Sequence, residues 1–449
     1  MRAVLKWFAF AVAVLAVPAV GAAVSAVSAF DALYAPGPPR PVPAAAPPAH
    51  DPAKPTAVVV VGDHGAVVSD ALAPYEILAA TGRFNVYTAA PHRGPKPLTG
   101  GLDLVPDFTF DDLPAPDLVV VPALPDVDEA GSEPVKAWLR AQAARGAKLL
   151  SVCNGGAVLA SAGLLDGRPA TAHWLKVDTW ADQYPAVHWV RGQRFVDDGT
   201  VVTTAGILSG IDGTLHWVER LAGRAVAADA AAAIGWRRYG TTVPVTPPAS
   251  MPDAAAIVNA AFRWNPDRIG VLLADGVGEV ELASVFDTQG QSLTSRTLAV
   301  SAGGGPVRSR HGLTFLPRAD LTTAPDLDRL LVPGATRGVT PPPGGPAPEY
   351  VHDRPGFAYD TAVSGLARST DVATARWTAK VLELPSDGIA FEGRAWPWLP
   401  TAVPVVLILL GTAMLVVIVR LRAARRFSPG AAAAADGSCP KWPEAGAPG

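Results

Sequence analysis

One cysteine of this sequence lies where a strand is expected to turn into a helix. The run KLLSVCNGG places Cys153 after an apolar segment typical of a buried strand and before two glycines. Such a strand-to-helix turn, a nucleophile elbow, exposes one side chain above the edge of a sheet. A helix N-terminus favours the thiolate, so we expect a lowered pKa for the Cys153 thiol. These residue types indicate nucleophilic chemistry, with an inert buried cysteine as the alternative.

The surroundings of the cysteine suggest how a reaction would be supported. The backbone N–H groups of Asn154 and Gly155 follow the sulfur and are the predicted donors to a developing oxyanion. No cofactor is indicated by any motif. The eight histidines are scattered without the spacing of a zinc site, so no metal is predicted.

Expected strands and helices alternate on both sides of Cys153. The expected strands are 57–61, 84–89, 118–122, 148–152 and 200–204, and the expected helices are 71–80, 133–145, 157–164 and 213–222. Several of these strands are short runs of valine and leucine, which suit a strand that is buried on both faces. The alternation predicts an α/β fold in which helices cover both faces of a parallel sheet.

Proline-rich segments divide the chain into a series of parts. The predicted parts are a signal peptide or signal-anchor helix (1–30), a linker (31–55), a domain carrying the cysteine (56–243), a second linker (244–256), a second lobe (257–390), a transmembrane helix (399–419) and a basic, then disordered, tail (420–449). Cys439 falls in that tail and is given no role.

The second lobe repeats the opening of the first. Gly94-Pro95 is echoed by Gly305-Pro306, a spacing of 211 residues (305 − 94), and the helix containing Asp70 aligns near Glu281 with one residue deleted. The repeat then departs, with one helix expected over 360–384 but no elbow and no cysteine. We therefore expect a truncated, chemically silent lobe that packs on the first as an internal pseudo-dimer. A homodimer is the alternative.

Hydrophobic segments near the two ends predict membrane attachment. Residues 7–30 carry no charge and suit either a cleaved signal peptide ending at Val27-Ser28-Ala29 or a retained anchor. Residues 399–419 are also uncharged and are long enough to span a bilayer. Arginines follow this second segment at once, which predicts a cytoplasmic tail and places the bulk of the chain outside the cytoplasm. The net charge of −3 gives no reason to expect nucleic acid as a partner.

Three motifs in order resemble the ThiJ/PfpI family, which has a class I glutamine amidotransferase-like fold. SVCNGGAVLASAGLLDGRPATAHW (151–174), VVTTAGILSGIDGTLHWVERLAG (201–223) and SDALAPYEIL (69–78) are similar to the isonitrile hydratase branch and to the N-terminal domain of amidase-type transcriptional regulators. The resemblance spans nearly the whole first lobe and implies a flavodoxin-like sandwich.

The resemblance also assigns roles to individual residues. Asp70 lies at the position of the family's acidic partner of the cysteine, and His173 lies on its Thr-His-Trp position, lining the pocket or satisfied as a structural histidine. Glu76 is expected to have a structural role in preference to direct involvement in the chemistry of the site. Asn154 replaces the family's usual threonine, and Ala73 replaces a glycine beside Pro74. Both departures bear on catalysis.

The implied function is binding, and possible conversion, of a small molecule by a cysteine-dependent hydratase or hydrolase. A non-catalytic ligand sensor or a redox sensor is the alternative. His216 and Glu219 are three residues apart on an expected amphipathic helix, so they are interpreted as packing or surface residues. Glutaminase activity is therefore disfavoured. Asn154 stands directly after the cysteine, so the sequence lacks a pair of adjacent cysteine and histidine residues.

Overall fold

The computed structural model describes residues 2–43, 48–240 and 246–427 of the chain. Parts of the first two predicted linkers, and the tail from residue 428 with Cys439, lie outside the described residues. One compact unit comprises Gly21–Ala402, and the residues before Gly21 and after Ala402 belong to a second unit, which is helical where the structure describes it.

A seven-stranded sheet forms the centre of the region that contains the cysteine. Its order is β10-β11-β7-β6-β1-β2-β5, with bounds Phe195–Asp197, Val201–Thr204, Lys148–Ser151, Leu118–Val121, Thr56–Val60, Asn85–Ala90 and Phe108–Thr109. All neighbouring strands are parallel except β10 and β11. Every residue of β1 and β6 is buried, as expected for central strands covered on both faces. The predicted α/β fold with a parallel sheet is confirmed.

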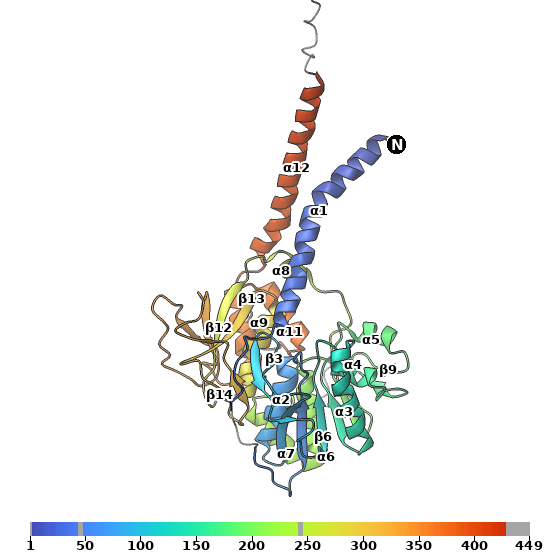
Figure 1. Ribbon diagram of the computed structural model, residues 1–449, viewed down its shortest axis with the longest axis vertical. Helices are drawn as coiled ribbons and strands as arrows, with labels where there is room; N and C mark the ends of the chain where they lie inside the picture. Colours follow the sequence, from blue (N-terminus) through green and yellow to red (C-terminus); the bar gives the residue numbers. More distant parts are fainter. Residues whose placement is uncertain (1, 44–47, 241–245, 428–449) are drawn as a thin grey trace, which may run out of the picture. The chain divides into compact units, whose positions relative to one another are not determined.

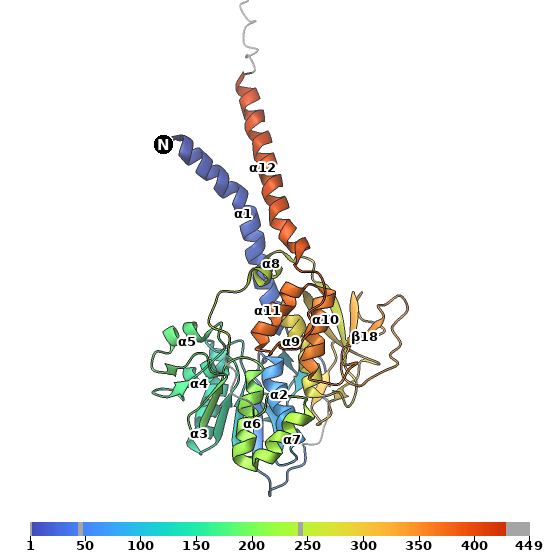
Figure 2. The ribbon, with the colours of Figure 1, turned by 180° about the vertical axis from the view of Figure 1, so that it is seen from behind.

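Helices cover this sheet (Figures 1 and 2). They are α2 (Val68–Ala80), α3 (Glu133–Ala144), α4 (Gly155–Ser161), α5 (Val177–Gln183), α6 (Ser209–Ala222) and α7 (Arg224–Ala233). Helices α3 and α4 pack together, and α2, α6 and α7 form another packed group. Short elements complete the region: the 3-10 helix η2 (Ala130–Ser132) and strands β8 (Pro169–Ala170) and β9 (His188–Trp189).

A second, five-stranded parallel sheet follows in the chain. Its order is β16-β13-β12-β17-β18, with bounds Ala319–Asp320, Ser295–Ser301, Asp267–Leu272, Arg329–Val332 and Pro348–Tyr350. It is accompanied by α8 (Ala254–Phe262), α9 (Glu279–Ser292), α10 (Ala358–Ser369) and α11 (Val372–Leu382). The single helix predicted over 360–384 is wrong, because the Asp371 side chain accepts a hydrogen bond from the Thr374 N–H at 2.8 Å and caps a new helix there.

An antiparallel sheet joins the two regions. Its order is β14-β15-β4-β3, with bounds Val307–Arg308, Thr314–Leu316, Leu102–Val105 and Lys96–Leu98. Leu104 of β4 is paired with Phe315 of β15, and both side chains are fully buried. Helices α2 and α9 also pack against each other, side by side in both views (Figures 1 and 2). The two sheets therefore belong to one continuous folded unit.

Two helices are long and apolar enough to cross a membrane, judged by length and composition alone. Helix α1 (Arg2–Asp31) leads into the 3-10 helix η1 (Ala32–Tyr34), and α12 (Trp398–Phe427) contains the predicted span 399–419. The last part of α1 belongs to the folded unit, where the Ser25 hydroxyl donates to the Ala260 carbonyl of α8 at 2.9 Å.

Candidate functional site

Cys153 lies at the turn between β7 and α4. Its φ of +57° is left-handed, a strained conformation for a residue with a side chain. The turn begins where the Val152 N–H donates to the Val121 carbonyl at 2.9 Å, which continues the pairing with β6 for one residue. Cys153 is only 4% exposed. The geometry is that of a nucleophile elbow whose sulfur is enclosed.

Gly155 allows the elbow to approach β6. A Cβ atom at this position would lie 2.0 Å from the Val121 carbonyl oxygen, so no larger residue fits. The Gly155 N–H donates to the Val152 carbonyl at 2.8 Å. This donor is already engaged in closing the turn, so its role as an oxyanion donor stays a prediction.

Asn154 contacts the sulfur through its backbone. Its N–H is hydrogen-bonded to the Cys153 thiol and favours the thiolate. The Asn154 side chain is turned elsewhere, and its Oδ1 accepts from the Trp180 indole N–H at 2.9 Å. The amide side chain that replaces the family's threonine therefore anchors α5 to the elbow.

Asp70 is fully buried in the first turn of α2. Its Oδ2 accepts from the Ala123 N–H at 3.0 Å, whereas Oδ1 has no hydrogen-bond partner among the described residues. Burial raises the pKa of this carboxyl well above its usual value, against the Ala123 N–H, which lowers it, and with Asp287 adding to the rise. Burial of an unpaired carboxylate oxygen is costly, which is why the protonated form of Asp70 is favoured relative to an exposed carboxyl.

The surroundings of the Cys153 thiol disfavour its thiolate form. Burial raises its pKa well above the usual value, Asp70 raises it further, and the Asn154 N–H opposes both. Glu383 and Asp287 add smaller contributions in the same upward direction. The predicted lowering is therefore wrong, because the field of one short helix is outweighed by burial among carboxyl groups.

Two of these carboxyl groups come from outside residues 56–243. Asp287 on α9 accepts from the Ser69 N–H at 3.1 Å and from the Thr99 hydroxyl at 3.0 Å. Glu383, directly after α11, accepts from the Ser209 hydroxyl and lies 3.9 Å from the Arg194 guanidinium. Sequence reasoning missed both. The 211-residue spacing of the repeat pairs Asp287 with Glu76. This pairing was the one sequence signal that could have pointed to Asp287.

Tyr34, from the N-terminal part of the chain, reaches the acidic cluster formed by Asp70 and Asp287. Its neighbours are fixed on the folded unit, since the Leu33 carbonyl accepts from the Gly100 N–H at 2.9 Å and the Ala35 carbonyl accepts from Arg318 at 2.8 Å. Burial raises the pKa of the Tyr34 phenol well above its usual value, and Asp70, Asp287 and Cys153 add to the rise. No sequence pattern pointed to this residue.

His173 is a satisfied histidine. Its Nε2–H donates to the Val381 carbonyl at 2.9 Å, and its Nδ1 accepts from the Leu175 N–H at 3.1 Å. Burial lowers the pKa of His173 to about 4, so the ring is neutral at physiological pH. Of the two alternatives left open by the sequence, this arrangement matches the structural one.

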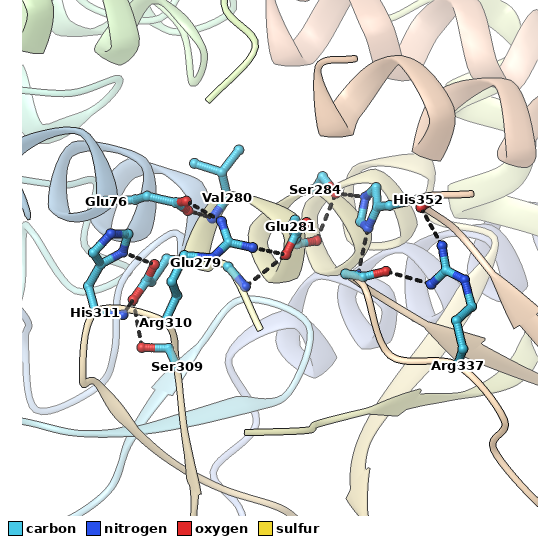
Figure 3. Close-up of polar contacts among 12 residues, drawn as sticks. Glu76, Glu279, Val280, Glu281, Ser284, Ser309, Arg310, His311, Arg337 and His352 are labelled. Atoms are coloured by element: carbon cyan, nitrogen blue, oxygen red, sulfur yellow. Dashed lines mark hydrogen bonds and ion pairs between the residues drawn. The ribbon is translucent and has the colours of Figure 1, made fainter. Parts of the chain in front are cut away.

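Glu76 faces α9 and is 3% exposed (Figure 3). It accepts from the Val280 N–H at 2.5 Å and from Arg310 at 3.0 Å. Glu76, Glu279 and His311 bring possible metal-ligand atoms within 4.8 Å of one another, a group that sequence spacing did not anticipate. Arg310 supplies positive charge there, and His311 already donates to Glu279 at 2.8 Å, so the carboxylates are satisfied without a cation.

His216 and Glu219 lie on α6, away from the elbow. His216 pairs with Asp197 at 2.8 Å, and Glu219 accepts from the Tyr239 hydroxyl at 2.6 Å. Both are engaged in local contacts of the kind expected for surface or packing residues.

The family model that matches this chain is that of the DJ-1/PfpI family, over residues 56–220. Those residues form a DJ-1/PfpI domain. The domain is 37% identical over 106 residues to an isonitrile hydratase of Pseudomonas putida, a match that covers 23% of this chain and 46% of that protein. It is 35% identical over 113 residues to the HTH-type transcriptional regulator CdhR of Pseudomonas aeruginosa, covering 24% and 31%. The chain thus spans less than half the length of these curated relatives.

Part of this chain is similar to several solved structures. A THiJ/PfpI family protein from Pseudomonas syringae is 26% identical, with a TM-score of 0.37 and coverage of 46% of this chain and 81% of that one. Drosophila melanogaster DJ-1beta is 22% identical, with a TM-score of 0.35 and coverage of 40% and 97%. The sheet order of the DJ-1/PfpI domain itself identifies it as a parallel α/β sandwich.

Proposed function

We propose that the DJ-1/PfpI domain binds a small neutral electrophile and adds the Cys153 thiol to it, with Asp70 transferring the proton. The observation that carries this proposal is the buried pair itself: a cysteine at a left-handed elbow, and an acid whose Oδ1 lacks a partner among the described residues. Both groups have raised pKa values, caused mainly by burial, and the raised pKa of Cys153 keeps its thiol neutral in the resting site.

Charge in the site selects the class of substrate. Asp70, Asp287 and Glu383 all act on the thiol, so an anionic substrate would be repelled or would have to bind with extra protons. A small neutral molecule avoids that cost. An isonitrile is such a molecule, and its hydration is the activity named for the relative from Pseudomonas putida.

The proposed reaction balances without a cofactor. The sulfur bonds to the terminal carbon of the isonitrile, and the thiol proton moves through the Asp70 carboxyl to the same carbon, which gives a thioimidate. Water then adds to that carbon, the carbon–sulfur bond breaks and a proton returns to sulfur. The product is an N-substituted formamide, and the enzyme is regenerated.

A turnover assay on the full chain in detergent tests the proposal. Cyclohexyl isocyanide is the substrate, and formation of its formamide is followed by liquid chromatography and mass spectrometry. Cys153→Ser is expected to abolish turnover and Asp70→Asn to reduce it by about 100-fold or more, while Cys439→Ser is the matched control. Turnover that persists in Cys153→Ser would overturn the mechanism.

A binding module without turnover is the second candidate, and the 4% exposure of Cys153 favours it. Here the same isonitrile raises the melting temperature in the wild type and in Cys153→Ala alike, with no formamide formed. The redox-sensor alternative is not favoured, because oxidation requires thiolate character and the pKa of Cys153 is raised by burial. The site also offers no basis for glutaminase activity, since His216 is engaged away from Cys153.

We further propose that the chain is membrane-anchored with its folded unit outside the cytoplasm. Two apolar helices support attachment, and the arginines after residue 419 support a cytoplasmic C-terminus by the positive-inside rule. A cysteine placed at residue 305 and one placed at residue 436, each in a Cys439→Ser background, report the orientation through an impermeant thiol reagent on intact cells. Labelling of the second position but not the first would overturn it.

The second sheet is proposed to be a degenerate copy of the first domain, packed as an internal pseudo-dimer. The pairing of Leu104 with Phe315, which are 211 residues apart, supports this, since identical positions meet where a dyad crosses a sheet. A monomeric protein by light scattering is then expected. A stable homodimer would count against the proposal.

A further inference from the structure

We infer that the second sheet carries a binding site of its own, for a small oxyanion such as a carboxylate or a phosphate. A cavity of about 390 Å³ opens at the carboxyl ends of β17 and β18. Its charged and titratable lining residues are Glu76, Glu281, Arg310, Arg337, His352 and Arg354. Apart from Glu76, these charged and titratable residues lie outside the DJ-1/PfpI domain match, and the site does not depend on the chemistry proposed for Cys153.

Strand register places His352 in the position that Cys153 has in the first sheet. The Val351 N–H donates to the Val332 carbonyl at 3.1 Å, as the Val152 N–H donates to Val121, and the next residue is His352. In open parallel sheets, ligands bind outside the carboxyl ends of the strands. The cavity therefore lies where the architecture of a parallel sheet forms binding sites.

His352 lines this cavity, and hydrogen bonds hold its ring in place (Figure 3), so it is not a nucleophile. Its Nδ1 accepts from the Gly334 N–H at 2.8 Å, and its Nε2–H donates to the Ser284 hydroxyl at 3.1 Å. That hydroxyl donates in turn to the Glu281 carbonyl at 2.8 Å. Burial lowers the pKa of His352, so the ring is neutral and both nitrogens are engaged. The sheet has retained a shaped pocket without a reactive group at its elbow position.

Arg337 brings positive charge that no carboxylate neutralises in the contacts described. Its guanidinium donates to the Gly334 carbonyl at 3.0 Å and to the His352 carbonyl at 2.9 Å, and it lies over the Tyr350 ring at 5.2 Å. Carbonyl partners orient a guanidinium but leave its full charge. Arg337 is therefore held in place at the rim of the cavity as a preorganised cation.

The other charges leave the cavity positive. The Arg310 guanidinium is 3.0 Å from both Glu76 and Glu281, and burial raises the pKa of Glu76 to about 7, so Glu76 is only partly ionised at neutral pH. The Arg354 side chain is 76% exposed and lies 3.9 Å from the carboxylate of Asp353. Three guanidinium groups thus face one full carboxylate and one partial one within the cavity.

The N-terminus of α10 adds to this preference. Ala358 and Thr361, in the first turn of this 12-residue helix, line the cavity. Backbone N–H groups and the helix dipole favour negative charge at such a position. Guanidinium groups bind planar or tetrahedral oxyanions with paired hydrogen bonds. The combination fits a small carboxylate or phosphate and disfavours a cation.

Titration calorimetry on the full chain in detergent tests this site, with sodium phosphate and sodium succinate as separate ligands. We expect saturable binding of at least one of them, weakened by added salt, and the comparison distinguishes phosphate from carboxylate preference. Arg337→Gln and Arg354→Gln are each expected to weaken binding by about 10- to 100-fold. Arg268→Gln, an exposed arginine on β12, is the matched control, and Cys153→Ser should bind as the wild type does.

Two results would overturn the inference. One is the absence of saturable binding of either anion up to about 10 mM, an affinity weaker than about 3 kcal/mol. The other is an affinity that is unchanged in the Arg337→Gln, Arg354→Gln double variant. Melting curves without ligand accompany each variant, so that loss of binding is read only from protein that remains folded.

Discussion

The Asp287 carboxylate of α9 accepts the backbone N–H of Ser69 at 3.1 Å, in the first turn of the helix that carries Asp70. Helix α2 makes the reciprocal contact, in which Glu76 accepts a hydrogen bond from the Val280 N–H in the first turn of α9. Each helix thereby satisfies an N–H group that the N-terminus of the other leaves free. The position of Asp70 therefore depends on a residue from outside the DJ-1/PfpI domain match.

Replacing Asp287 by alanine is expected to destabilise the folded unit by about 2–3 kcal/mol, because the buried Ser69 N–H loses its acceptor. Urea unfolding followed by circular dichroism measures the change. Asp387→Ala is the control, since Asp387 is 93% exposed and pairs with Arg238 at the surface; its effect should stay within about 0.5 kcal/mol. Equal effects of the two changes would contradict the capping role.

Stability is expected to depend on pH through Glu76. Burial, followed by the charge of Glu279, raises the pKa of Glu76 from its ordinary 4.5 to about 7. The native state then binds more protons than the unfolded state between these values, so the free energy of unfolding falls as pH rises through this window. His311, whose raised pKa reflects its hydrogen bond to Glu279, also loses its contribution as pH rises.

The Glu76→Gln variant tests this dependence. Glutamine keeps an acceptor for the Val280 N–H but cannot ionise, so the fall in unfolding free energy between pH 5 and 7.5 should shrink by about 1–2 kcal/mol. Glu219→Gln, on the partly exposed side of α6, should leave the pH profile unchanged. A Glu76→Gln profile parallel to that of the wild type would show that Glu76 does not titrate in this range.

Local sequence pattern predicted the strand and turn that carry Cys153, but not the distant residues that surround it. The strand before Cys153 and the small residues after it are visible in the run KLLSVCNGG alone. The buried strands β1 and β6 are likewise visible as short apolar runs. Asp287 and Glu383 reach the site only because α9 and α11 pack on the first region. No local sequence signal encodes a contact between residues more than 200 positions apart.

The direction in which the pKa of Cys153 is shifted could not be inferred from the sequence for the same reason. A helix N-terminus is readable from sequence and predicts a thiolate, but burial and the number of neighbouring carboxyl groups are tertiary properties. The predicted helix over 360–384 failed differently. Its apolar spacing continues across Thr370 and Asp371, and only the side-chain cap at Asp371 shows that one helix ends and another begins.

Alkylation of Cys153 should report a protonated thiol. In a Cys439→Ser background, iodoacetamide is expected to react at pH 7.5 at least about tenfold more slowly than with free cysteine, whose pKa is about 8.5. The midpoint of the pH–rate curve should lie well above that value, because burial raises the pKa of Cys153. The midpoint separates ionisation from restricted access, which lowers the rate at every pH.

Removing a neighbouring charge should move that midpoint downward. Glu383→Gln and Asp70→Asn each delete a group that raises the pKa of the thiol, whereas Asp387→Asn lies at the surface and serves as control. Rapid alkylation with a midpoint below pH 7 would instead indicate an activated thiolate and would favour the redox-sensor alternative.

The N-terminal helix is expected to remain in the mature protein. Cleavage after Ala29 would remove the hydrogen bonds from Ser25 to Ala260 and from Arg296 to the Ser28 carbonyl, at 2.9 and 3.3 Å, each worth about 1 kcal/mol. It would also free the chain before Tyr34, which reaches the acidic cluster. Intact-mass analysis of the membrane fraction should therefore find residues 2–30, and a mature chain beginning at residue 30 would show a cleaved signal peptide instead.

Gly155→Ala should separate the shape of the elbow from its chemistry. The new methyl group would meet the Val121 carbonyl oxygen at 2.0 Å, so β6 and the elbow must move apart, at a cost of about 2–4 kcal/mol. Gly305→Ala is matched to it, because a Cβ there has nothing within 4 Å and should change stability by less than about 0.5 kcal/mol. Thermal denaturation gives both values. If Gly155→Ala were as stable as Gly305→Ala, the close approach of the elbow to β6 would not constrain residue 155, and the enclosure of the Cys153 sulfur would need another cause.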